Sequence, residues 1–82
     1  MEHWETGEGR LLCNGRRVLS SDQIVLFRQG GRGCAAYVHA HPDLQLPSEP
    51  ARLLLDDGRS GLFRLVRRRG TLLCLHSETG LR

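Results

Sequence analysis

The segment Ala51–Arg69 constrains the fold more than any other, because it encodes a β-hairpin within local sequence. Two apolar runs flank the turn residues Asp56-Asp57-Gly58, and the second run ends in three consecutive arginines. Aspartate favours turns because it bonds to nearby backbone, and glycine reaches positive φ without steric cost. The pattern therefore predicts two antiparallel strands, with arginine concentrated near the end of the second.

The loop length of this hairpin decides which side chains meet across it. A two-residue loop pairs Leu53 with Leu62, whereas a three-residue loop with Gly58 as a left-handed bulge residue pairs Leu53 with Gly61. The longer loop also brings Leu53 and Phe63 to the same face of the sheet. We predict the three-residue loop, because it gives the purer apolar face.

The rest of the chain also predicts short strands separated by turn residues. Asn14-Gly15 is a strong signal for a two-residue hairpin, because both central positions of a type I′ turn need positive φ. Ser20-Ser21-Asp22 predicts a further turn, although a helix near Ser20–Phe27 with a serine N-cap is the alternative. Besides the two arms of the first hairpin, we expect strands at residues 10–13, 16–19, 23–29, 34–40 and 71–76.

These strands define an all-β single domain, a small antiparallel barrel or rolled sheet of roughly six to seven short strands. We expect residues 1–9 to be a loose lead-in, residues 41–50 a proline-rich loop and residues 77–82 a tail. Side chains alternate between the two faces of a strand, which predicts the buried positions. The expected core consists of Val25, Phe27, Ala36, Val38, Leu53, Leu55, Phe63 and Leu65.

Two strands, Leu53-Leu54-Leu55 and Leu72-Leu73-Cys74-Leu75, are apolar on both faces. A chain of 82 residues has a thin core and hides little surplus apolar surface. We therefore expect a homodimer or another protein partner that covers the exposed strands.

Charge and composition narrow the class of protein. The formal net charge is +3, and all 12 basic residues are arginine. Arginine offers a planar donor pair for phosphate and carboxylate groups, although a genome rich in arginine codons explains the bias as well. No apolar run approaches the roughly 20 residues that span a bilayer, and the acidic, polar start is unlike a signal peptide. We expect a cytoplasmic protein with no membrane association.

The densest charge cluster consists of Arg64, Arg67, Arg68 and Arg69. A tight turn would gather these guanidinium groups around one anion, such as a phosphate of a nucleic acid or nucleotide, with Tyr37 as a stacking surface. The alternative is a charged edge that blocks unwanted strand pairing. These four arginines are our candidate anion-binding residues.

Metal binding and catalysis have weaker signals. His39 and His41 share one strand face and could bind one metal, but no spacing points to a third ligand. The cysteines Cys13, Cys34 and Cys74 each lie in an apolar run, which favours buried packing. No serine has a nucleophile-elbow context. We expect no cofactor, no metal and no enzymatic activity, and keep metal-dependent activity at the histidine pair as an alternative.

The layout resembles that of small uncharacterised bacterial β proteins with a terminal Leu-x-Leu-x-Asp-Gly-Arg hairpin. The matching residues are Leu53, Leu55, Asp57, Gly58 and Arg59. The resemblance implies a fold and no activity. The apolar surplus, together with the lack of catalytic chemistry, leads us to expect a non-enzymatic binding or regulatory module whose partner is another protein. The alternative is an anionic ligand, nucleic acid or nucleotide, held by the arginine cluster.

Overall fold

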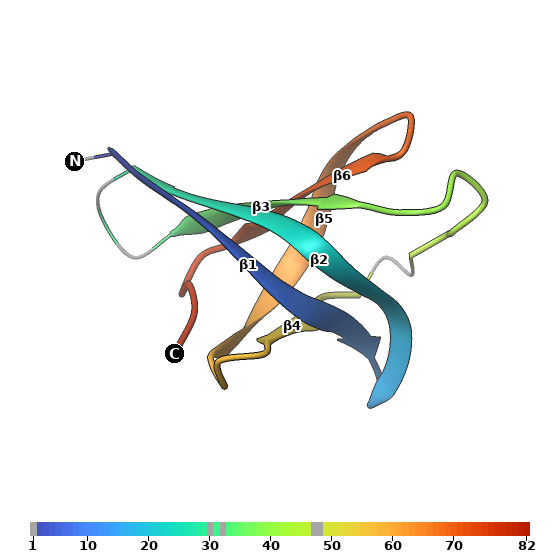
Figure 1. The fold of residues 1–82 in the computed structure, drawn as a ribbon, viewed down its shortest axis with the longest axis horizontal. Helices are drawn as coiled ribbons and strands as arrows, with labels where there is room; N and C mark the ends of the chain where they lie inside the picture. Colours follow the sequence, from blue (N-terminus) through green and yellow to red (C-terminus); the bar gives the residue numbers. More distant parts are fainter. Residues whose placement is uncertain (1, 30, 32, 47–48) are drawn as a thin grey trace.

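The computed structural model describes residues 2–29, 31, 33–46 and 49–82. Its strands are β1 (Glu2–Cys13), β2 (Arg16–Gln29), β3 (Cys34–His39), β4 (Ala51–Leu55), β5 (Ser60–Arg69) and β6 (Leu72–Ser77). All neighbouring strands are antiparallel and close into a barrel in the order β1-β2-β3-β6-β5-β4 (Figure 1). The predicted all-β barrel is thus confirmed. The described residues contain no helix long and apolar enough to cross a membrane.

Both predicted hairpin turns form. Asn14 has a φ of 53° and Gly15 a φ of 78°, as a type I′ turn requires. In the β4–β5 hairpin Gly58 has a φ of 97°, and Leu53 pairs with Gly61. The three-residue loop is therefore confirmed, together with the register that it implies.

The predicted loose lead-in at residues 1–9 is wrong. β1 begins at Glu2 and pairs with β2 along its length, and the two strands form the long ribbon that crosses the barrel in Figure 1. Trp4 packs on Phe27 of β2 with ring centroids 4.2 Å apart. This contact and the backbone ladder anchor the N-terminal segment to the sheet.

The predicted turn at Ser20-Ser21-Asp22, and the alternative helix there, are also wrong, because β2 runs through these residues. The pairing of β1 with β2 shifts between Gly7 and Gly9, so β2 carries an extra residue at this point. The N–H of Gln23 donates to Ser21 Oγ at 3.1 Å. The sequence suggests a turn because serine and aspartate side chains can bond to nearby backbone. In the structure, the hydrogen bond to Ser21 accompanies a β-bulge.

The core consists of inward-facing side chains from every strand. Five of the predicted core residues are buried, namely Ala36, Val38, Leu53, Leu55 and Phe63. Among the described residues, the buried apolar core consists of Leu11, Ile24, Leu26, Cys34, Ala36, Val38, Ala51, Leu53, Leu55, Phe63, Leu73 and Leu75.

The predicted burial of Val25 and Phe27 in the core is wrong. Ile24 and Leu26 fill the barrel instead, and Val25 and Phe27 lie half-buried on its outer face. Because all four residues are apolar, alternation in the sequence does not distinguish the two faces. The β2 bulge and the pairing with β1 and β3 select the face that is buried.

Leu65 is also not a core residue, since it is 37% exposed. β4 begins at Ala51, which pairs with Phe63, so β5 extends beyond the end of its neighbour on that side. No β4 residue covers the flank of Leu65.

Barrel closure depends on a short ladder between β1 and β4, in which residues 9–12 pair with residues 52–55. Gly9 is buried at this seam. A Cβ atom on Gly9 would lie 2.4 Å from the Leu54 carbonyl oxygen and 2.9 Å from Leu55 Cα. Because both neighbours are backbone atoms, they cannot rotate away, and the seam requires glycine.

An ion-pair network extends the closure beyond this ladder. Arg59 donates two hydrogen bonds to the Glu5 carboxylate, at 2.8 and 3.2 Å, and its Nε donates to Asp57 at 2.9 Å. The network connects β1 to the β4–β5 turn. The hydrogen bonds from Arg59 hold the pKa of the Glu5 carboxyl below its ordinary value, in spite of its partial burial.

Glu5 is therefore expected to contribute stability that depends on pH. Its pKa is lower in the folded chain than the ordinary 4.5, so the contribution is present above that value and is lost as pH falls through the folded pKa. Urea unfolding of wild type and Glu5→Gln between about pH 6 and pH 3 should show a stability difference that shrinks toward acid. A difference that stays constant over this range would contradict the role of Glu5.

The two segments outside the strands also pack on the barrel. Residues 41–50 contain the predicted loop, in which Leu44 and Leu46 pack against the core; positions 47 and 48 lie outside the described residues. In the tail predicted at residues 77–82, the backbones of Ser60 and Arg82 donate to each other at 2.9 Å in both directions. The C-terminal residues are thus fixed to the start of β5.

Candidate functional site

The outer surface of the closed barrel carries arginine on β5 and aromatic rings on β1, β2 and β3, at positions that follow one another around five of the strands. Cross-strand pairing defines two rows, Arg64–His76–Ala35–Phe27–Trp4 and Arg67–Cys74–Tyr37–Val25–Thr6. We call the surface formed by these residues and Arg69 the aromatic face. None of its positions carries a carboxylate.

A bulge in β5 decides which arginines reach this face. The pairing of β5 with β6 shifts between Leu65 and Arg67, so Val66 is an extra residue on β5. Because the shift reverses the alternation of side chains, Arg67 and Arg69 follow Arg64 onto the outer surface. Within the described part of the chain, these three guanidinium groups form no hydrogen bond or ion pair.

Arg68 differs from the other three predicted anion-binding residues. Its guanidinium donates to the backbone carbonyl oxygens of His41 and Pro42, both at 2.8 Å, and to that of Leu44. The side chain therefore binds the loop after β3, which lies beside the β5–β6 turn in Figure 1. Arg68 therefore stabilises the loop, and its guanidinium does not belong to the aromatic face.

Arg68→Ala is expected to lower the free energy of unfolding by about 1–2 kcal/mol, because several loop carbonyls lose a charged donor. Arg67→Ala removes the same side chain from the neighbouring exposed position and should change stability by less than about 0.5 kcal/mol. Thermal or urea unfolding measures both. Equal stability losses in the two variants would contradict the distinction.

Three aromatic rings form the other part of the face. Trp4 stands 4.2 Å from Phe27 and 6.3 Å from Tyr37 between ring centroids. Trp4 remains 57% exposed, so its ring is open to a ligand. The sequence indicated Tyr37 alone as a stacking surface, because Phe27 was predicted in the core and Trp4 was predicted only to pack against another part of the chain. Trp4 and Thr6 are alternate residues and therefore share one face of β1. This spacing is the sequence signal that could have identified the aromatic cluster.

The two candidate metal ligands, His39 and His41, have different hydrogen-bond partners. His39 ends β3, and its Nδ1 lies 3.5 Å from Thr71 Oγ1. His41 lies in the following loop, where its Nδ1 accepts the N–H of Asp43 at 3.1 Å. Among the residues that the structure describes, no three His, Cys, Asp or Glu side chains are grouped so that they could hold a metal ion.

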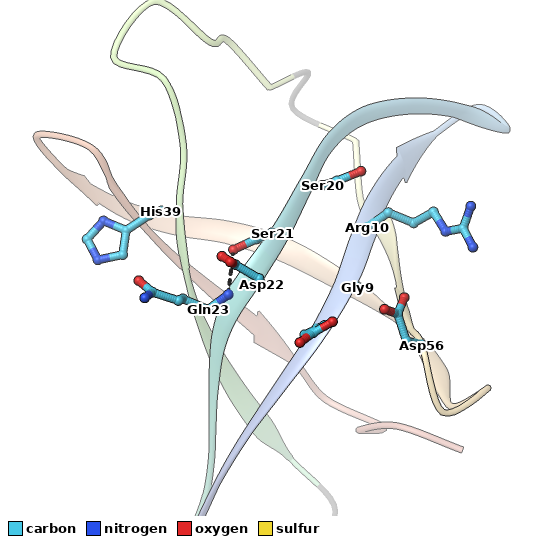
Figure 2. A pocket seen from close by; sticks show the side chains of 9 residues that line it. Gly9, Arg10, Ser20, Ser21, Asp22, Gln23, His39 and Asp56 are labelled. Carbon is cyan, nitrogen blue, oxygen red and sulfur yellow. Dashed lines mark hydrogen bonds between the residues drawn. The ribbon is translucent and has the colours of Figure 1, made fainter.

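A polar hollow of about 530 Å³ opens beside the β2 bulge (Figure 2). Its lining residues are Glu8, Gly9, Arg10, Ser20, Ser21, Asp22, Gln23, His39 and Asp56. In Figure 2, His39 and Asp56 lie at opposite ends of the hollow, and the marked hydrogen bond joins Gln23 and Ser21. No serine hydroxyl in this described region bonds to His39, so the hollow does not assemble a nucleophile with a base.

The three cysteines are free thiols, with Cys34 buried and Cys13 and Cys74 half-buried. Burial raises the pKa of the Cys34 thiol, and it also raises the pKa of Cys13. A raised pKa keeps a thiol protonated at neutral pH and therefore weakly nucleophilic. This agrees with the packing role predicted for Cys13 and Cys34.

No protein family, curated protein or solved structure shows a significant match to this chain. The aromatic face combines arginine side chains with three aromatic rings, of which Trp4 is exposed and Phe27 and Tyr37 are half-buried.

Proposed function

We propose that the protein is a small non-enzymatic binding module that holds single-stranded nucleic acid across the aromatic face. One observation carries the proposal: Arg64 and Arg67 begin the cross-strand rows that lead to the cluster of Trp4 and Tyr37, and Arg69 follows Arg67 on β5. The sequence favoured a protein partner and kept an anionic ligand as the alternative. The common face favours nucleic acid for this site.

The arginines supply the contact to phosphate. Arg67 and Arg69 are alternate residues of β5, so their backbones stand about 7 Å apart along the strand. That separation is comparable to the distance between neighbouring phosphates of an extended strand. Guanidinium groups match phosphate oxygens with two parallel hydrogen bonds, and these groups have no described protein partner to release first.

The rings supply the contact to bases. Tyr37 lies two strands from Arg67 in the same row, about 10 Å away across the sheet. Cys74 stands between Arg67 and Tyr37, so a small side chain separates this arginine from the ring, whereas His76 and Ala35 stand between Arg64 and Phe27. A backbone along β5 can therefore project bases toward Tyr37 and Trp4. Stacking needs exposed base faces, which single strands offer and duplexes do not.

A titration of labelled oligothymidylate, about 10 nucleotides long, tests the proposal at salt concentrations of about 50 and 200 mM. Three phosphate contacts predict a salt slope near −2, so binding should weaken about 20-fold over this range. Tyr37→Ala should weaken binding about fivefold or more at both salts, because it removes stacking.

A duplex of matched length is the control ligand. It carries more phosphate than the single strand, and it hides its base faces within the stack. Tighter binding to the duplex, or a Tyr37→Ala variant that binds like wild type, would contradict the proposal. Absence of binding at the lower salt concentration would refute it.

A further inference from the structure

A second outer surface lies on the part of the barrel where β1 meets β4. Cross-strand pairing defines the rows Arg17–Leu12–Arg52–Leu62 and Ser20–Arg10–Leu54–Ser60. Leucine and arginine alternate here both along the strands and across them. We call the surface formed by Leu12, Leu54, Leu62, Arg10, Arg17 and Arg52 the leucine face.

The apolar part of this face is open and hollowed. Leu62 is 50% exposed, while Leu12 and Leu54 are half-buried. A hollow of about 260 Å³ lies between Leu12, Pro50 and Leu62, and another of about 300 Å³ lies between Leu62 and Val66. Leu62 thus separates two hollows, and each is large enough to receive a side chain from a partner.

The leucine face carries three arginines, and carboxylates lie at its edges. Arg10 lines the hollow of about 530 Å³ with Glu8, Asp22 and Asp56, and Glu78 lines the hollow of about 300 Å³ beside Leu62. Arg10 and Arg17 form no hydrogen bond or ion pair among the described residues, and Arg52 donates to the Ser60 hydroxyl at 3.3 Å. The outward positions of the two rows carry no carboxylate and no aromatic ring. A ligand that complements this face needs both carboxylates and aliphatic side chains.

We infer that the leucine face docks an acidic segment of another protein, in which aspartate or glutamate alternates with leucine-like residues. Guanidinium groups bind carboxylates in bidentate pairs, and the exposed leucines bury apolar side chains of the partner. Arg10 and Leu12 lie about 7 Å apart along β1, as do residues i and i+2 of an extended segment. The partner pattern is therefore an acid at i and an apolar residue at i+2.

The arginines and leucines of this face disfavour two other ligands, namely nucleic acid and a second copy of the chain. Nucleic acid would find no ring for stacking, and it would leave the leucines exposed. A second copy packed face to face would bring the two sets of arginines together, which costs free energy through like-charge repulsion. An acidic peptide satisfies the charge and the apolar surface at once.

Selection from a displayed library of random 12-residue peptides against the wild-type protein tests the inference. We expect enriched sequences in which Asp or Glu alternates with Leu, Ile, Val or Phe. An enriched peptide, synthesised and labelled, should bind Arg17→Ala plus Arg52→Ala about 10-fold or more weakly than wild type. It should also bind Leu62→Ser several-fold more weakly. All three positions are exposed, and thermal unfolding checks that each variant stays folded.

Arg67→Ala plus Arg69→Ala is the matched control, because it removes the same charge from the aromatic face. This variant should bind the peptide like wild type, and oligothymidylate should not displace the peptide. The inference is overturned if the selection enriches no acidic–apolar pattern, or if the peptide binds all variants equally. A wild-type dimer that Leu62→Ser dissociates in sedimentation would overturn it too, because the face would then join two copies.

Discussion

Gly9→Ala is expected to destabilise the protein by about 2–3 kcal/mol in a urea unfolding titration, a large part of the stability of a small domain. The added Cβ would meet the Leu54 carbonyl oxygen and Leu55 Cα at distances that real Cβ contacts do not reach. Relief requires β1 and β4 to separate at the ladder that closes the barrel. The loss should therefore appear as a lower urea midpoint.

Gly7→Ala is the matched control. Gly7 lies two residues earlier on the same strand, its φ is not positive, and a Cβ there meets nothing within 4 Å. Alanine at this position should leave stability unchanged or raise it by up to about 1 kcal/mol, because it restricts the unfolded chain. If both variants unfold at the same urea concentration as the wild type, β4 does not approach position 9 closely enough to exclude a Cβ, which would contradict the requirement for glycine there.

Arg67→Ala plus Arg69→Ala should weaken oligothymidylate binding about 10-fold or more at about 50 mM salt. Each lost phosphate contact should also reduce the steepness of the salt dependence by about 0.7, so the slope should fall from near −2 to near −0.7. Titrations of wild type and variant at several salt concentrations measure both quantities.

Arg17→Ala plus Arg52→Ala tests whether net charge alone explains this result. It removes the same two charges from the leucine face, so long-range attraction falls equally in both variants. The proposed geometry predicts a wild-type salt slope for this variant. An equal loss of affinity in the two double variants would show that nucleic acid responds to overall charge and not to the aromatic face.

Local turn chemistry made much of the fold predictable from sequence. Asn14-Gly15 requires a type I′ turn, and Gly58 takes positive φ in the three-residue loop that was inferred from the apolar face alone. These signals depend on residues adjacent in the chain. Because these turn signals are local, they also determined the predicted register of β4 against β5.

The bulges were not predictable from local pattern. The register shift at Val66 places Arg67 and Arg69, rather than Arg68, on the same face as Arg64. The shift beside Gly9 lets β2 continue through Ser20 to Asp22. A bulge changes which residues of two neighbouring strands pair, and it leaves no clear pattern in the sequence of either strand. It therefore becomes apparent only when both strands are placed.

Long-range contacts account for the remaining differences. Residues 1–9 appear polar and loose in sequence, but the Glu5–Arg59 bonds join positions 54 residues apart. The requirement for glycine at position 9 likewise arises from β4, more than forty residues later. The pairing of β1 with β2 also joins residues far apart in the chain, and it places Trp4 beside Phe27.

The intrinsic fluorescence of Trp4 tests the central claim most directly, because Trp4 is the single tryptophan of the chain and belongs to the aromatic face. Oligothymidylate should quench this emission saturably, with the same dissociation constant as the titration of labelled strand. An abasic strand of equal length should bind more weakly and leave the emission nearly unchanged, because it offers phosphate without bases. Oligothymidylate that binds with no change in Trp4 emission would contradict the account.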